Sequence, residues 1–194
     1  MLRYFNLILI LLLGLTSFPQ NNIIRNTKNY ISKDFTELLF ISIENQKMYH
    51  IKNNNIISKY IISSSAYGTG NKAGSNKTPL GLHKVKEKYG KATPINGRMT
   101  GRVFYGDIAT IYADETKSKT DDITSRILWL TGLEPGVNMG GNVDSNKRFI
   151  YIHGTHEEGL IGIKASHGCI RMFNQDVLEL YEIVSPKTPV NLYL

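Results

Sequence analysis

The run Ser166-His167-Gly168-Cys169, near the end of the 194-residue chain, does most to decide both the fold and the chemistry. Cys169 is the only cysteine of the chain, so it cannot close an intramolecular disulfide. A single thiol that directly follows a glycine, with histidines nearby in the sequence, is typical of a cysteine nucleophile. The run therefore predicts acyl transfer through a thiolate.

Such a nucleophile needs a base, because a thiol with an ordinary pKa of about 8.5 is mostly protonated at neutral pH. His153 is well placed to serve, since it ends a strand-like run and the following Gly154 permits a sharp turn. Gly168 has no side chain, so the amides of Gly168 and Cys169, together with that of His167, could point at one anionic oxygen. These residues predict a base and an oxyanion hole around the thiol.

Two other interpretations of the same residues stay open. A cysteine or histidine in an apolar segment is commonly a buried core residue without chemistry. Alternatively, imidazole and thiolate both suit zinc, and four such ligands are available, namely His153, His156, His167 and Cys169. The spacing argues against zinc, because no CxxC pair is present and an H-x-C pair would place two ligands on one tight turn.

Several motifs together resemble one family. The segments 152–155, Ile-His-Gly-Thr, and 165–172, Ala-Ser-His-Gly-Cys-Ile-Arg-Met, are similar to the signature of the L,D-transpeptidase catalytic domain of the YkuD type, found in bacterial cell-wall enzymes. The segment 77–81, Lys-Thr-Pro-Leu-Gly, resembles the family's Thr-Pro-x-Gly turn, and 38–51 resembles its opening β-hairpin. The resemblance covers residues 36–194.

The resemblance implies a role for each matching residue. Cys169 would be the nucleophile, His153 the general base, and the backbone carbonyl of Gly154 the group that orients the base. Arg171 matches a position that neutralises a substrate carboxylate, although many members carry asparagine there. The remaining residues of the motif would shape the oxyanion and substrate site: Ser166, His167 and Gly168. No cofactor and no metal is implied.

The resemblance also implies a substrate. A peptidoglycan tetrapeptide stem would be cleaved after its L-centre, releasing D-alanine and leaving a thioester on the enzyme. An amine would then resolve the thioester, forming 3–3 cross-links or attaching the lysine of an outer-membrane lipoprotein to the sacculus. Water would instead make the protein an L,D-carboxypeptidase or an amidase. A non-catalytic wall-binding domain is disfavoured, because it would have no need of the full set of reactive residues.

The first residues predict export. One arginine precedes the aliphatic run 7–15, which ends at the segment 16–19, Thr-Ser-Phe-Pro, so residues 1–19 are expected to be a signal peptide or an uncleaved N-terminal anchor. Residues 20–35 are rich in asparagine and lysine and predict a polar linker. The catalytic domain would then lie in the periplasm or cell envelope, with that anchor as its only membrane contact.

The net charge of +7 is compatible with a substrate that carries carboxylates. Nucleic acid is the rival partner for a basic protein. The lysines and arginines are scattered rather than gathered in a run or along a helix face, which argues against nucleic-acid binding.

Local patterns predict a mainly β, sandwich-like domain over residues 36–194 with one or two short helices. Apolar alternation in 39–43, a turn at 44–46 and a return over 47–51 predict a hairpin, and Asn53-Asn54-Asn55 predicts the next turn. Asn174 is expected to cap an amphipathic helix, and a final strand follows Pro189. Cys169 is then expected at a strand–turn junction beside the strand of His153.

Residues 97–146 are rich in glycine turns around a strand-like stretch at 126–130, and they predict a lid over the cysteine. Trp129 within it is expected to be a core residue. His50 and His83 lie in strand patterns and are interpreted as structural. The acidic residues do not have the spacing of a calcium loop: Asp114, Asp121, Asp122 and Asp144.

Overall fold

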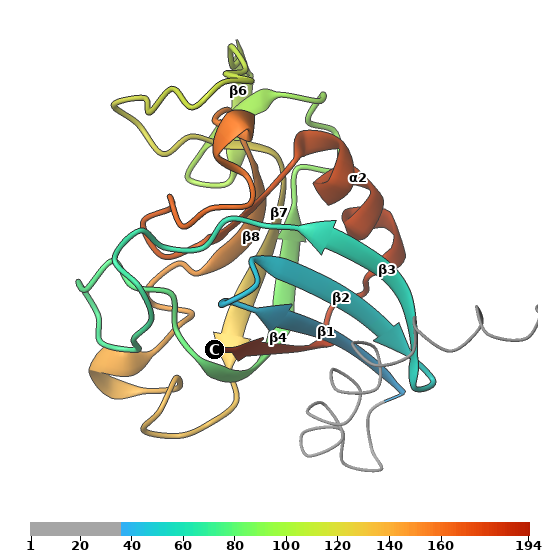
Figure 1. The fold of residues 1–194 in the computed structure, drawn as a ribbon, viewed down its shortest axis with the longest axis vertical. Coiled ribbons are helices and arrows are strands. Elements are labelled where there is room, and N and C mark those ends of the chain that lie inside the picture. Colours follow the sequence, from blue (N-terminus) through green and yellow to red (C-terminus); the bar gives the residue numbers. More distant parts are fainter. Residues whose placement is uncertain (1–35) are drawn as a thin grey trace, which may run out of the picture. The chain divides into compact units, whose positions relative to one another are not determined.

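The protein is represented by a computed structural model that describes residues 36–194 (Figure 1). The expected signal peptide or anchor at 1–19 and the expected linker at 20–35 lie outside the described residues. Within residues 36–194, no helix is long and apolar enough to cross a membrane.

The predicted opening hairpin is confirmed. Strands β1 (Glu37–Ser42) and β2 (Lys47–Lys52) pair antiparallel, and β2 continues into β3 (Asn55–Ile61). The asparagine turn forms because Asn53 and Asn54 adopt positive φ angles of 49° and 62°, a conformation that asparagine tolerates better than most residues. The burial of β1 does not alternate as expected, because Leu39, Phe40 and Ile41 are all buried.

The described strands form one 10-stranded sheet, ordered β3-β2-β1-β10-β4-β7-β5-β6, with β8 paired to β7 and β9 paired to β8. Beyond the hairpin, the strands are β4 (Gly81–Tyr89), β5 (Gly97–Thr100), β6 (Val103–Ile108), β7 (Ile123–Gly132), β8 (Tyr151–Thr155), β9 (Ile170–Met172) and β10 (Pro189–Tyr193). Two pairs are parallel, β1 with β10 and β8 with β9. Figure 1 shows β1–β3 crossing in front of the part that contains β4, β7 and β8.

The bent sheet encloses one hydrophobic core. Side chains from β1, β2 and β3 meet side chains from β4, β7, β8, β9 and β10 in a single cluster, which includes Leu39, Met48, Leu128, Ile152 and Leu192. Burial of this apolar area stabilises the fold at roughly 25 cal/mol per Å². The prediction of a mainly β, sandwich-like domain is therefore confirmed.

The described chain has one α-helix, α2 (Asn174–Ile183), and two short 3-10 helices, Gly141–Val143 and Glu158–Leu160. Val177, Leu180 and Tyr181 of α2 are buried, as the sequence pattern predicts. The capping prediction was wrong. Asn174 is the first helical residue, and its side-chain amide donates to Thr155 O while its backbone N–H donates to Oε1 of Glu158.

The 97–146 region is more regular than the predicted lid, because β5, β6 and β7 lie within it and belong to the sheet. An irregular segment remains at 109–122, which we call the strap. Trp129 is only partly buried, and it contacts Arg102 and Phe149 at ring distances of 4.6 and 5.9 Å. The expected core role of Trp129 is therefore confirmed in part, because the ring packs against the buried cluster of Met99, Ile127 and Tyr151 but is not fully buried.

His50 and His83 are structural, as expected. His50 Nε2 lies 2.6 Å from Oε1 of Glu37, and His83 Nε2 lies 2.8 Å from Oγ of Ser145. Both rings are buried.

Candidate active site

The pairing of β8 with β9 brings the segments that carry His153 and Cys169 side by side. β8 and β9 run parallel, with Ile152 opposite Ile170 and His153 opposite Arg171. Cys169 directly precedes β9, at the strand–turn junction expected for it. Its Sγ donates to Phe149 O at 3.4 Å and accepts from the Tyr151 amide at 3.4 Å.

The His153 ring is held in one tautomer. Its Nδ1 lies 2.7 Å from the carbonyl oxygen of Gly154. A carbonyl only accepts, so Nδ1 carries the proton and Nε2 of the neutral ring holds a lone pair. His153 is buried, and no hydrogen-bond partner of Nε2 lies within residues 36–194. A buried imidazole with a free Nε2 lone pair is suited to accept a proton.

Position 154 requires glycine. A Cβ built there would lie 2.5 Å from Oδ1 of Asn174 and 2.8 Å from Thr124 O. The tight packing keeps the carbonyl of Gly154 fixed under the imidazole of His153, so the backbone rather than a carboxylate orients the ring.

Burial sets the resting protonation of the pair. It raises the pKa of the Cys169 thiol to about 12, with Asp121 adding to the rise and the Tyr151 amide, Arg171 and Arg148 opposing it. Burial also lowers the pKa of His153, an effect that Asp121 and the Gly154 carbonyl oppose. The raised pKa of the thiol and the lowered pKa of the imidazole favour the neutral form of each group, rather than a preformed ion pair.

The turn that presents the thiol is held by hydroxyl groups. Ser166 Oγ donates to Cys169 O at 2.6 Å and accepts from the Gly168 amide at 3.2 Å. Thr78 Oγ1 donates to Gly168 O at 3.1 Å, which explains why the Lys-Thr-Pro turn accompanies the cysteine motif. Gly168 has φ of 128°, a conformation that side-chain-bearing residues rarely adopt.

The predicted oxyanion amides are only partly free. The Gly168 amide donates to Ser166, and the His167 amide donates to Oδ2 of Asp121 at 3.0 Å. For the Cys169 amide, no acceptor lies within the described part of the chain. The geometry therefore reduces the expected group of three donors to the Cys169 amide.

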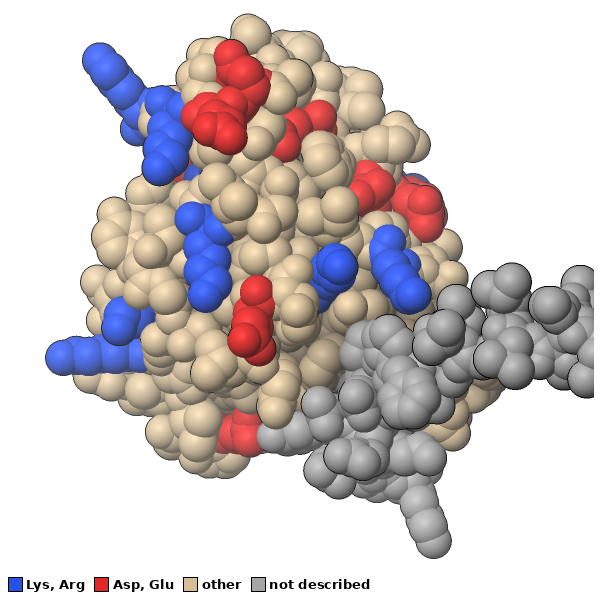
Figure 2. Space-filling view, viewed as in Figure 1, with Lys and Arg blue, Asp and Glu red and all other residues tan. Residues whose placement is uncertain are grey.

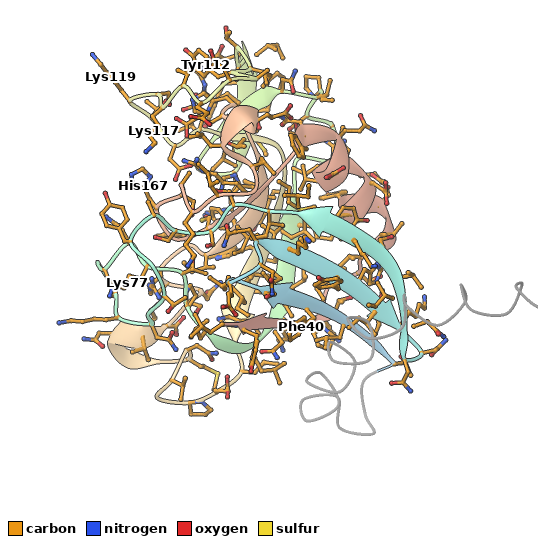
Figure 3. The ribbon with its side chains drawn as sticks, in the orientation of Figure 1. Phe40, Lys77, Tyr112, Lys117, Lys119 and His167 are labelled. Carbon is orange, nitrogen blue, oxygen red and sulfur yellow. The ribbon has the colours of Figure 1, made fainter. Side chains whose placement is uncertain are left out.

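His167 lies on the exposed side of the cysteine turn. Its ring Nδ1 lies 2.9 Å from Asp121, its side chain is 52% exposed, and its ring lies 5.8 Å from that of Tyr67. Figure 3 draws it at the periphery, on the same side as Lys77 and Lys117. His167 is therefore placed to hold the turn through Asp121.

Arg171 differs from its expected role. Its side chain is 1% exposed, Nη1 lies 2.7 Å from Glu157, and Nε and Nη2 lie 2.8 and 2.7 Å from Oδ1 of Asp121. The guanidinium group already forms ion pairs with two carboxylates of the protein. We therefore correct the expectation that Arg171 neutralises a substrate carboxylate, and assign it to the internal structure of the site.

Sequence reasoning missed three charged residues that surround the cysteine turn. Asp121 and Glu157 pair with Arg171, and Arg148 donates to the carbonyls of Gly70, Asn71 and Lys77. Arg148 is also near enough to the thiol to lower its pKa. No local pattern marks these residues, because each acts on a partner far away in the sequence.

The four candidate zinc ligands are not brought together. His156 Nε2 lies 2.7 Å from Ser118 Oγ, while His153 and His167 bond to Gly154 and Asp121. In the described region, no group of three or more histidine, cysteine, aspartate or glutamate side chains could hold a metal ion.

Comparison with known proteins identifies the family. The L,D-transpeptidase catalytic domain family, YkuD, matches residues 36–192, and the chain belongs to it. The putative L,D-transpeptidases YkuD of Bacillus licheniformis and Bacillus subtilis are 49% and 47% identical over 47 residues. These matches cover 24% of this chain and 28% and 29% of the relatives, so the chain matches less than a third of their length.

Solved structures of similar proteins include an L,D-transpeptidase from Mycobacterium smegmatis, with 16% identity, a TM-score of 0.49, and coverage of 82% of this chain and 59% of that one. An L,D-transpeptidase from Mycobacterium tuberculosis H37Rv has 15% identity, a TM-score of 0.48, and coverage of 82% and 58%.

Proposed function

We propose that the protein is a peptidoglycan L,D-transpeptidase that works through a thioester on Cys169. The observation that supports the proposal is the parallel pairing of β8, which carries a histidine whose Nδ1 is bound to Gly154 O, with β9, which Cys169 directly precedes. Membership of the L,D-transpeptidase catalytic domain family supports the same reaction class.

In the first half-reaction, Nε2 of His153 takes the thiol proton as Sγ attacks the carbonyl carbon of the stem's third residue. A neutral resting pair requires that proton transfer accompanies the attack, because the thiolate is not formed beforehand. The amide of Cys169 would donate to the developing oxyanion. The C–N bond then breaks, and the imidazolium returns its proton to the leaving amine of D-alanine.

In the second half-reaction, an acceptor amine attacks the thioester carbonyl. His153 takes the amine proton, the C–S bond breaks, and the thiolate of Cys169 recovers the proton. The product is a new amide, either a 3–3 cross-link to a second stem or a bond to the lysine of an outer-membrane lipoprotein. No oxidation or reduction occurs, and no cofactor takes part.

We place this activity in the periplasm or cell envelope, after export directed by residues 1–19. Stem peptides carry carboxylates, and the net charge of +7 favours their approach. Figure 2 shows lysines and arginines in small separate groups, with acidic residues between them, on the face drawn, which is unlike the continuous basic surface that binds nucleic acid.

The test incubates the purified protein with a disaccharide tetrapeptide and identifies the products by mass spectrometry. Cross-linked dimer with release of D-alanine is the expected result. Tripeptide without dimer would mean that water, rather than an amine, resolves the thioester, so that the protein is a hydrolase. Unchanged substrate would contradict the proposal. The Cys169→Ala variant is the control that ties either product to the thiol.

A further inference from the structure

We propose that Asp121 is a positioning residue for the transfer reaction, whose single carboxylate clamps both sides of the cysteine turn and supplies the fixed negative charge that the protonated His153 requires. The role in transfer rests on the proposed function. The clamp itself is a property of the described fold.

The clamp is visible in the contacts of the two carboxylate oxygens. Oδ2 accepts from the His167 amide at 3.0 Å and lies 2.9 Å from the ring Nδ1 of His167. Oδ1 accepts from Nε of Arg171 at 2.8 Å and lies 2.7 Å from its Nη2. His167 precedes Cys169 by two positions and Arg171 follows it by two, so one side chain holds the nucleophile's turn from both flanks.

The strap that carries Asp121 is itself fixed to the site. The Tyr112 amide donates to His156 O at 2.8 Å, and the Gly159 amide donates to Tyr112 O at 2.9 Å. A Cβ at Gly159 would lie 1.8 Å from Asp114 O, so the strap packs directly on this glycine.

Glu157 joins the strap to the arginine of the clamp. Its Oε1 accepts from the Ser118 amide at 2.5 Å, and its Oε2 accepts from Nη1 of Arg171 at 2.7 Å. Asp121 therefore approaches the turn on a segment with several independent anchors, and its position is defined by more than its own ion pair.

The charges around the pair explain what the carboxylate adds. Burial alone would raise the pKa of Asp121, but Arg171, His153 and His167 lower it overall, so the group is ionised. Asp121 favours the protonated form of His153, while Arg171 opposes it. At Cys169 the same carboxylate disfavours the thiolate, which Arg171 and Arg148 favour. Asp121 thus stabilises the proton acceptor and does not activate the thiol.

The opposite effects of Asp121 on His153 and on Cys169 allow a test that separates the proposal from a merely structural role. Asp121→Asn keeps the shape of the side chain and removes its charge. Transfer, measured as kcat/KM on the disaccharide tetrapeptide, should fall about 10- to 100-fold, mainly through kcat. Alkylation of Cys169 by iodoacetamide at pH 8 should become about 3- to 10-fold faster, because the thiol pKa falls when the nearby negative charge is lost.

The adjacent Asp122 offers a matched control. It is also an ion-paired aspartate of the strap, 2.7 Å from Nε of Arg98 and 3.9 Å from Nδ1 of His156. Asp122→Asn should leave both the transfer rate and the alkylation rate within about twofold of the wild type, a difference below 0.5 kcal/mol in either barrier. Equal effects of the two substitutions would overturn the proposal, as would slower or unchanged alkylation in Asp121→Asn.

Asp121→Glu covers the case in which the amide variant does not fold. This variant keeps the charge but moves the carboxylate by one methylene, so transfer should fall while the thiol pKa stays near that of the wild type. Full transfer activity in Asp121→Glu would refute the clamp. Alkylation does not depend on the substrate, so an inactive wild type would reject the proposed function while the alkylation rates still decide the effect of Asp121.

Discussion

The resting state of Cys169 can be tested directly by its reactivity across pH. Burial raises the thiol pKa to about 12. At pH 8 the thiolate fraction is then on the order of 1000-fold smaller than for an unperturbed thiol. Because the thiolate is the reactive form, iodoacetamide should modify the folded protein about 1000-fold more slowly than the unfolded chain at pH 8.

The assay is simple because Cys169 is the only cysteine of the chain. Rates of single-adduct formation would be followed by intact mass between pH 6 and pH 10, with the protein in concentrated urea as the control. The folded protein should show a rate that rises about tenfold per pH unit with no plateau. A plateau near neutral pH would mean a preformed thiolate–imidazolium pair, and the neutral resting state derived from burial would be refuted.

The same pKa carries a consequence for stability. The folded state binds its thiol proton more tightly than the unfolded state, so the stabilising contribution is complete below about pH 9 and is lost as the pH rises toward about 12. Cys169→Ser removes this contribution, because its hydroxyl does not titrate in that range. The variant should therefore lose less stability than the wild type between those two pH values.

Three further predictions follow from other contacts. Cys169→Ala should lower turnover by at least about 1000-fold, with an unchanged circular dichroism spectrum; appreciable residual transfer would reject the thioester. Gly154→Ala should lower the free energy of unfolding by about 1–3 kcal/mol in urea titrations, because the new methyl would meet Asn174 Oδ1 at 2.5 Å. Burial lowers the pKa of His83 from 6.5 to about 4, so its contribution of about 3 kcal/mol is complete above pH 6.5 and is lost as the pH falls through 4. His83→Gln should flatten that acid limb of the stability curve, and an equally steep limb in the variant would contradict this.

Patterns that depend on neighbours in the chain predict much of this fold. The opening hairpin follows from apolar alternation, and the turn at Asn53 follows from the tolerance of asparagine for positive φ. The buried face of α2 follows from its helical spacing. β6 could not be predicted in this way, because five of its six residues are exposed and no apolar period marks it.

In the candidate site, too, local patterns predict some of the residues and miss others. His153, Gly154 and the cysteine turn lie within a short stretch that the sequence analysis singles out. Asp121 does not, because its partner Arg171 is 50 positions away and both residues are charged side chains of an ordinary kind. A buried guanidinium needs carboxylate partners, but the chain offers 16 acidic residues and no local rule selects two of them.

The position of β10 has a consequence for the order in which the domain can form. In the described sheet, β10 lies between β1 and β4, so Pro189–Tyr193 is the strand that joins the β1–β3 unit to the rest. Figure 1 shows this dark red strand beside β1. During synthesis, β1 must wait unpaired on one side until residues 189–193 have emerged, because Val190 lies 151 positions after its partner Leu39. Such distant contacts slow folding, and they leave one edge of β1 open until the last strand has been made.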